Sequence, residues 1–341
     1  MKTLRVAVLM HEALVPPEKA ESEAAKTAAP WRTEYDVLTS LRAMGHEAWP
    51  VGAGDDLEPV RRALDERRPD IVFNLLEEFR GSRTYAPYVP AYLDLIGQPY
   101  TGCNPRGMIL SHSKALANRI LRSHRVRVPD FALFERDRRI RRPRRLSFPL
   151  LVKSATEHGS VGISQASIVR DDEQLRQRVE MVHAQLGTDA VAEQYIEGRE
   201  FYVGVLGNRR LETLPVWELT FENLPDNVPN IATARVKWDA QYQKSRGVTT
   251  GEARDLSEPQ RVHLLRMCKR AYRALDQSGY ARMDLRQSAE GDMYLLECNH
   301  NPQLALGEDF ADSAHAAGLP YAKLLQRILN LGLRQRAQAH E

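Results

Sequence analysis

The stretch that decides the fold is numbered 279–304 and reads GYARMDLRQSAEGDMYLLECNHNPQL. Apolar and polar residues alternate in 281–286 and again in 294–299. A period of two is typical of β-strands that have one apolar and one polar face. A two-residue turn at 290–291 would join the two strands as an antiparallel hairpin.

The polar face of this hairpin gathers two carboxylates, one amide and one arginine. The turn places Asp284 opposite Glu297 and Arg282 opposite Asn299, with cross-strand Cβ atoms about 5 Å apart. Two carboxylates that close repel each other unless one holds a proton or a cation lies between them. Carboxylate and amide oxygens suit Mg²⁺, and an arginine beside them can hold a phosphate through two hydrogen bonds. The alternative is an ordinary surface hairpin with a solvated charged face.

The chain has the composition of an ordinary globular protein. Its 341 residues are 43% hydrophobic and 27% charged, enough for two or three domains. No apolar run approaches membrane-spanning length, and the N-terminal one is too short for a signal-peptide core, so we expect a cytoplasmic protein. Three scattered cysteines lack metal-ligand spacing and are expected to be inert thiols: Cys103, Cys268 and Cys298.

The net charge of +3 conceals one local concentration of arginine. Residues 136–145 contain seven arginines and one aspartate, so the rest of the chain sums to −3. A chain-wide basic footprint for nucleic acid is therefore absent. The arginine run is expected to form a solvated loop, and the alternative is a docking site for RNA or an acidic protein.

The first hundred residues alternate strand-like and helix-like segments, which predicts a parallel α/β sheet. The segment 16–30 follows the first strand, where open α/β sheets gather ligands, and it is either a lid or disordered. The long, polar segment 222–252 is expected to be a lid or binding loop. The expected strands are 4–10, 47–51, 70–76, 148–153, 190–195 and 201–206, and the expected helices are 34–44, 57–68, 111–124, 171–186, 257–276 and 321–333.

A second group of residues suggests a phosphate-binding loop. Lys153 ends a predicted strand, and Gly159 and Gly162 in the following loop let backbone N–H groups approach an anion. Ordinary hairpins look similar, and neither the Walker nor the dinucleotide glycine fingerprint is present. Lys114 lies in the first turn of the predicted helix 111–124, where a cation is unfavourable for the helix. Without other support, Lys114 is an ordinary solvated charge.

Together these segments resemble the ATP-grasp ligases, and among them the D-alanine:D-alanine ligase branch. The likeness covers nearly the whole chain and is densest at 70–74, 95–102, 148–163, 193–200 and 279–304. It implies an α/β protein of the ATP-grasp fold in which two subdomains enclose the nucleotide. The implied units are an N-terminal parallel α/β domain at 1–110, a central ATP-grasp subdomain at 111–192 and a C-terminal subdomain with the metal site at 193–341.

The resemblance also implies a reaction. In such enzymes ATP phosphorylates a carboxylate, an amine attacks the acyl phosphate, and an amide or peptide bond forms with release of ADP and phosphate. The implied cofactors are ATP and Mg²⁺, with Mn²⁺ as an alternative. The implied partners are a small carboxylate, a small amine and a second copy of the chain in a homodimer, with no membrane and no nucleic acid.

Carried over by position, the family's functional residues fall into three sets. The implied catalytic residues are Arg282 and Lys153. The implied metal ligands are Asp284, Glu297 and Asn299. The implied nucleotide contacts are Lys114 and Lys153 on the phosphates, Glu157, Gly159, Ser160 and Val161 in the loop over them, Glu193 near the adenine, Glu200 on the ribose, and Lys237 in a mobile segment.

The chain departs from the family where the amino-acid substrates bind. Gln241 stands where the family has a lysine, with Lys237 and Lys244 nearby as substitutes, and a family serine aligns near Glu308. The family's Pro-Gly becomes Pro-Gln at 302–303. Losing a cation and gaining an anion argues against a second substrate with a free carboxylate there.

Two residues expected for the first substrate are also missing. The family's N-terminal glutamate is not identifiable, and its histidine after the third strand is replaced around Glu77 and Glu78. We therefore predict a carboxylate–amine ligase whose acceptor is a cationic or neutral amine other than D-alanine. The alternative is a non-catalytic ATP-binding sensor or partner protein of the same fold.

Overall fold

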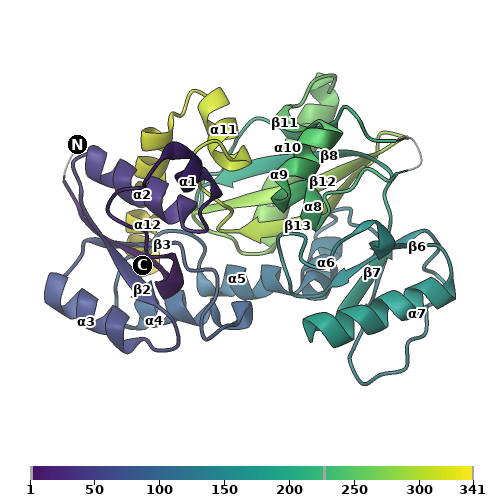
Figure 1. The fold of residues 1–341 in the computed structure, drawn as a ribbon, viewed down its shortest axis with the longest axis horizontal. Coiled ribbons are helices and arrows are strands. Elements are labelled where there is room, and N and C mark those ends of the chain that lie inside the picture. The colour runs from purple at the N-terminus through teal and green to yellow at the C-terminus, as the bar shows by residue number, and fades with distance from the viewer. Residues whose placement is uncertain (1–2, 226–227, 340–341) are drawn as a thin grey trace.

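A computed structural model describes residues 3–225 and 228–339, and three β-sheets divide the molecule along its long axis (Figure 1). At one end lies a parallel three-stranded sheet of order β2-β1-β3. Its strands are β1 (Arg5–His11), β2 (Glu47–Ala53) and β3 (Ile71–Asn74). The predicted parallel α/β arrangement of the first hundred residues is confirmed.

Helices cover this first sheet and bury its apolar strands. Val37 and Leu41 of α2 are fully buried, as expected for the apolar stripe of a helix that packs on a sheet. Gly45 follows that helix with a positive φ, a backbone conformation that residues with a side chain rarely adopt. The helix α12 returns from the far end of the sequence and packs on the same core. The helices of this part are α2 (Arg32–Ala43), α3 (Glu58–Arg67), α4 (Tyr88–Leu95), α11 (Asp309–Ala316) and α12 (Tyr321–Ala339).

A four-stranded antiparallel sheet forms the other end of the molecule, in the order β4-β7-β5-β6. Its strands are β4 (Phe131–Phe134), β5 (Leu150–Ser154), β6 (Ile168–Val169) and β7 (Ala190–Gln194). The helix α7 (Asp172–Met181), capped by Asp171, buries Leu175 and Val179 against the sheet and continues as a π-helical turn, Val182–Leu186. The predicted helix 171–186 is therefore confirmed, with a change of helix type in its last turn.

The third, six-stranded sheet lies between the other two and carries the hairpin (Figure 1). The apolar side chains of the hairpin pack beneath α10 (Glu258–Ala274). That helix begins with the predicted capping box between Ser257 and Gln260. The order is β11-β10-β8-β12-β13 with β9 beside β8, and the strands are β8 (Gly198–Leu206), β9 (Glu212–Thr213), β10 (Trp217–Phe221), β11 (Val248–Glu252), β12 (Tyr280–Ser288) and β13 (Met293–His300).

The predicted helix 111–124 is instead the junction of two helices, α5 (Pro105–His112) and α6 (Lys114–Ser123). Ser113 between them has an extended backbone, and its hydroxyl caps α6 by accepting a hydrogen bond from the backbone N–H of Leu116. This break makes Lys114 the first residue of a new helix.

The remaining segments are short. Within 16–30 the chain forms one short helix, whose Lys26 Nζ lies 3.6 Å from Asp36 Oδ1. Of the two alternatives expected there, disorder is not what the structure shows, and the lid stays a prediction. The segment 222–252, apart from residues 226–227, contains two short helices. The remaining elements are α1 (Glu23–Ala28), α8 (Ala234–Trp238), α9 (Ala240–Arg246) and the 3-10 turns Glu12–Leu14, Arg83–Tyr85 and Gln165–Ser167. Among the described residues, no helix has the length and apolar character needed to cross a bilayer.

Candidate active site

The hairpin has the predicted cross-strand pairs but a different turn. Asp284 lies opposite Glu297, and Arg282 lies opposite Asn299. The strands end at Ser288 and Met293, and a bulge between residues 284 and 285 shifts the register by one. The two-residue turn predicted at 290–291 is therefore wrong, because the bulge absorbs one residue and lengthens the loop.

Asp284 is the centre of one group of contacts. The guanidinium of Arg282 donates two hydrogen bonds to its carboxylate, at 2.8 and 3.0 Å, and the Asn299 amide donates a third at 2.9 Å. Burial acts to lower the pKa of Arg282, but the Asp284 charge outweighs it and raises that pKa further. The arginine is thus a fixed cation, also stacked 4.8 Å over the ring of Tyr202.

Glu297, on the neighbouring strand, is the centre of a second group. Its Oε1 lies 3.0 Å from Lys114 Nζ and 2.7 Å from His158 Nδ1. Burial would raise the pKa of Glu297, but the charges of Lys114 and His158 hold it well below its usual range. The carboxylate is therefore ionised, and its charge is balanced by residues from two other parts of the chain.

Lys114 is a buried cation rather than a solvated one. Only 4% of its surface is exposed, and its Nζ also donates to the backbone carbonyl of Glu157. Burial lowers the pKa of Lys114; Glu297 opposes that effect, and Lys153 adds to it. A lysine held at a helix N-terminus against both burial and the helix dipole has a role other than helix stability.

Lys153 and Glu193 form a second buried ion pair, with Nζ and Oε1 2.6 Å apart. Burial would lower the pKa of Lys153, yet the charge of Glu193 raises it above its ordinary value. The other oxygen of Glu193, Oε2, is buried and has no hydrogen-bond partner among the residues that the structure describes. Such an oxygen can accept a hydrogen bond from a bound amino group.

Glu200 is already engaged by two partners. Its Oε1 accepts a hydrogen bond from the Tyr202 hydroxyl at 3.0 Å, and its Oε2 lies 3.4 Å from Arg286 Nε. Arg286, absent from the sequence-based candidates, also donates to the backbone carbonyl of Ile196 at 2.7 Å. Glu200 is thus held rigidly at the start of β8, with lone pairs left for a further donor.

The glycine loop after β5 is joined to the segment that carries Lys237. Gly159 and Ser160 have positive φ angles of 67° and 62°. The Ser160 hydroxyl donates to the carbonyl of Ala232 at 2.6 Å, and the Trp238 indole N–H donates to the carbonyl of Gly159 at 3.0 Å. Lys237 itself is half-buried on α8, and Val161 is largely exposed. The two loops therefore form one cover beside the lysines.

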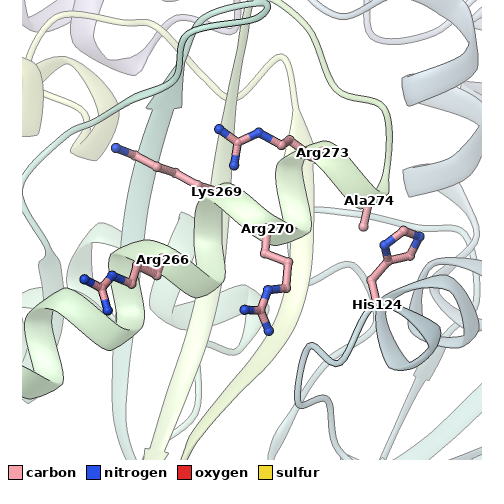
Figure 2. A pocket seen from close by; sticks show the side chains of 6 residues that line it. All are labelled: His124, Arg266, Lys269, Arg270, Arg273 and Ala274. Carbon is pink, nitrogen blue, oxygen red and sulfur yellow. The ribbon is translucent and has the colours of Figure 1, made fainter.

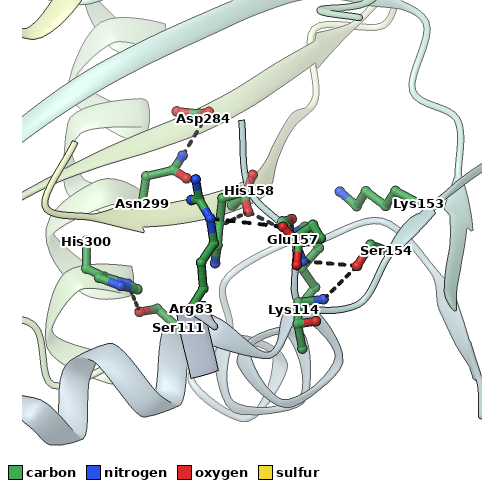
Figure 3. A network of polar contacts seen from close by, with 12 residues as sticks. Arg83, Ser111, Lys114, Lys153, Ser154, Glu157, His158, Asp284, Asn299 and His300 are labelled. Atoms are coloured by element: carbon green, nitrogen blue, oxygen red, sulfur yellow. Dashed lines mark hydrogen bonds and ion pairs between the residues drawn. The ribbon is translucent and has the colours of Figure 1, made fainter. Parts of the chain in front are cut away.

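Sequence reasoning missed a cluster of three histidines, one of which, His158, contacts Glu297. Figure 3 shows two of them, His158 and His300, near Asn299. The rings of His112 and His300 lie 5.7 and 5.9 Å from the ring of His158. Burial and then the neighbouring His158 lower the pKa of His300 to about 3 and that of His112 to about 4, so both rings are neutral at pH 7. His300 Nδ1 lies 2.8 Å from the Ser111 hydroxyl. His158 stands between Glu157 and Gly159 in the predicted phosphate-binding loop. Its position in that loop is the sequence feature that could have indicated a role for it.

Arg83 links this cluster to the first sheet. Its guanidinium lies 3.3 Å from Glu77 and 4.0 Å from Glu157. The resemblance implies that a family histidine is replaced around Glu77 and Glu78, and Glu77 has Arg83 as its partner in the structure. The sequence offered no pattern that would pair Arg83 with either glutamate.

Glu308, the anion that aligns near a family serine, has a cationic partner. Its Oε1 lies 2.9 Å from Arg32 Nη1, and Arg32 also contacts Asp36 and the carbonyl of Leu306. Burial raises the pKa of Glu308, and the Arg32 charge opposes that effect. Arg32 and Glu308 are 276 residues apart in sequence, so only the packing of the folded chain brings the two side chains together.

Comparison with known proteins identifies the family. The model of the D-ala D-ala ligase C-terminus matches residues 120–330, well over half of the chain. The chain belongs to the D-alanine–D-alanine ligase family. The predicted resemblance, the ATP-grasp fold and the class of ATP-grasp carbon–nitrogen ligase are all confirmed.

Individual relatives of this ligase family member cover nearly its whole length. The uncharacterised protein y4sG of Sinorhizobium fredii is 32% identical over 317 residues, 90% of each chain. The D-alanine–D-alanine ligase of Desulfotalea psychrophila is 30% identical over 299 residues, 86% of this chain and 87% of that protein. The crystal structure of the D-alanine–D-alanine ligase from Bacillus anthracis in complex with ATP superposes with a TM-score of 0.76 at 22% identity, covering 99% of this chain and 100% of that one.

Proposed function

We propose that this ligase uses ATP to join a small carboxylate to a small amine through an acyl phosphate. The observation that carries the proposal is the ion pair between Lys114 Nζ and Glu297 Oε1, 3.0 Å apart. It lies beside the hydrogen-bonded group of Asp284, Arg282 and Asn299. Fixed cations next to ionised carboxylates on one hairpin are what phosphoryl transfer requires.

The nucleotide is assigned to the two buried lysines and the cover above them. Lys114 and Lys153 supply positive charge for the phosphates, and the N–H groups around Gly159 approach them from the loop. The unpartnered Oε2 of Glu193 fits an exocyclic amino group such as that of adenine. Glu200 keeps acceptor capacity for ribose hydroxyls, and the nearby Lys237 adds a further charge.

Asp284, Glu297 and Asn299 fit Mg²⁺ as a set of hard oxygen donors. Across the described residues, no group of three or more His, Cys, Asp or Glu side chains is placed to hold a metal, but this set needs only two carboxylates and an amide. Protein cations now balance both carboxylates. Bound Mg²⁺, or Mn²⁺, would neutralise charge on the phosphates.

The reaction balances with the residues present. A substrate carboxylate oxygen attacks the γ-phosphorus, and the bond to the β-phosphate oxygen breaks to release ADP. The amine nitrogen then attacks the carbonyl carbon of the acyl phosphate, the carbon–oxygen bond breaks to release phosphate, and the nitrogen passes its proton to the departing phosphate. Arg282 stabilises the negative charge that develops on the phosphoryl and carbonyl oxygens.

The acceptor is proposed to be a neutral or cationic amine other than D-alanine. Arg32, the cation in contact with Glu308, is already bound to two carboxylates. A free carboxylate on the acceptor would have to displace them, and Gln241 supplies no charge in compensation.

Three wider features remain proposals. The division of the chain into three units, with boundaries near residues 110 and 192, is supported by the presence of three separate sheets. The helix α12 packs on the core of the first unit. A homodimer is proposed from family membership. A cytoplasmic location is proposed because the reaction consumes ATP.

The test is ADP release from MgATP across a panel of D- and L-amino acids, diamines and small carboxylates, with mass spectrometry of each reaction. We expect ADP formation that requires one acid and one amine and yields their condensation mass. D-alanyl-D-alanine made at a comparable rate would overturn the acceptor proposal while leaving the ligase class intact.

The variant that tests the role of the site is Glu297→Gln, which keeps the shape of the side chain but removes its charge. We expect this variant to fold and to lose turnover. If no pair of substrates drives turnover while ATP binds, and Glu297→Gln changes metal affinity alone, the protein is a nucleotide-binding sensor instead.

A further inference from the structure

The outer face of α10 carries a row of basic side chains. Arg266, Lys269, Arg270 and Arg273 follow each other at the spacings that place residues on one side of a helix, over about 10 Å of its length. Figure 2 shows these four side chains extending from the helix, with His124 beside them. The opposite face of α10 is buried on the six-stranded sheet, so the basic face has a fixed orientation.

Two adjoining cavities run along this face and share Arg266 and Arg270. One has a volume of about 640 Å³ and the other about 440 Å³. His263 of α10 also lines the groove, and basic groups from outside this helix complete the walls: His124, Arg125 and Arg127. We call this surface the α10 groove.

The positive charge of the α10 groove is largely uncompensated. Its one lining carboxylate, Asp292, already pairs with Arg127. In the described chain, none of the four α10 residues in the row forms a salt bridge; Arg270 only donates to the carbonyl of Arg125 at 3.4 Å. Like charges three and four residues apart on a helix repel each other and destabilise it. An anion bound in the groove would remove that repulsion.

The lining also limits what kind of anion fits. The combined cavity has the size of a small-molecule site rather than of a duplex or a folded partner. Neither cavity is lined by Phe, Tyr or Trp, so the surface offers no platform on which nucleic-acid bases stack. Most of the basic groups are arginines, which bind phosphate oxygens through two hydrogen bonds.

We propose that the α10 groove binds a compact polyphosphate anion, at a site separate from the reaction centre. Separation follows from the alternation along the hairpin. Met283 and Cys298 face α10, whereas Asp284 and Glu297 point to the opposite side of the sheet. The loop of the same hairpin, at Gly291 and Asp292, forms one edge of the groove.

The test is calorimetric titration of inorganic tripolyphosphate into the full chain at about 150 mM salt, with the reaction centre saturated by MgADP. We expect one tripolyphosphate per chain, with a binding constant that falls steeply as salt rises. The double variant Arg266→Glu/Arg270→Glu is expected to weaken binding at least tenfold. The matched control is Arg62→Glu/Lys323→Glu, with the same change of charge on exposed side chains of α3 and α12, and it should alter binding less than twofold.

The outcomes separate this proposal from the reaction. If MgADP fails to bind, the proposed function is in doubt, but the paired variants still show whether the groove holds tripolyphosphate. Absence of binding by the wild type, or equal weakening by both variants, overturns the proposal. Stronger binding of an oligoglutamate peptide or a single-stranded RNA than of tripolyphosphate would also overturn it in favour of that partner.

Discussion

Glu34 is a buried carboxylate whose replacement by glutamine should stabilise the protein in a pH-dependent way. It lies in the first turn of α2 with 5% of its surface exposed, and within 3–225 and 228–339 its Oε2 finds no hydrogen-bond partner. Burial raises the pKa of Glu34 to about 7; its own backbone N–H opposes the shift, and the charge of Glu77 adds to it. The folded protein therefore retains this proton where the unfolded chain has lost it.

The sign and size of the effect follow from that difference. Stability that Glu34 contributes is present below its ordinary pKa of 4.5 and is lost as pH rises to about 7, because ionisation favours the unfolded chain. At about 1.4 kcal/mol for each tenfold change, the full loss is up to about 3 kcal/mol. The variant Glu34→Gln, which mimics the protonated form, should match the wild type near pH 4 and exceed its free energy of unfolding by up to about 3 kcal/mol at pH 8.

The assay is urea unfolding followed by circular dichroism at several pH values between 4 and 8. Glu58→Gln is the matched control, since Glu58 also lies in the first turn of a helix but is exposed. It should change the free energy of unfolding by less than about 0.5 kcal/mol at every pH. A Glu34→Gln curve parallel to that of the wild type would refute the reasoning, because it would mean that Glu34 is ionised in the folded protein.

Three further predictions concern the reaction centre. Arg282→Lys should reduce ADP release at least about 100-fold, because a lysine cannot keep the two hydrogen bonds to a carboxylate while facing the phosphoryl group; a rate above one third of wild type would contradict this. Lys153→Met should cost about 3–5 kcal/mol in urea unfolding by leaving Glu193 charged and unpaired, and Lys153→Met/Glu193→Gln should recover most of it; an unchanged loss in the double variant would count against the pair. Trp238→Phe removes the hydrogen bond to Gly159, so the KM for ATP should rise up to about tenfold, while unfolding stays unchanged because Trp238 is 65% exposed.

Much of the fold was readable from local pattern. Alternation of strand and helix predicted the parallel sheet, and the capping box at Ser257 predicted where α10 begins. The turn at 290–291 was misjudged because a bulge has no signature in a period-two pattern. The single helix expected at 111–124 was also wrong, because the break at Ser113 depends on backbone angles rather than on apolar spacing.

By itself, the sequence determined which chemical groups share one face of the hairpin. The pairs Asp284–Glu297 and Arg282–Asn299 follow from strand periodicity, and periodicity is a local property of the backbone. Only the tertiary structure decided which charges neutralise one another. His158 reaches Glu297 across 139 residues of sequence, and Arg32 reaches Glu308 across 276, because the packing of separate sheets brings them together. Electrostatic energy depends on distance in space and on burial, and neither is written in the spacing of residues along a chain.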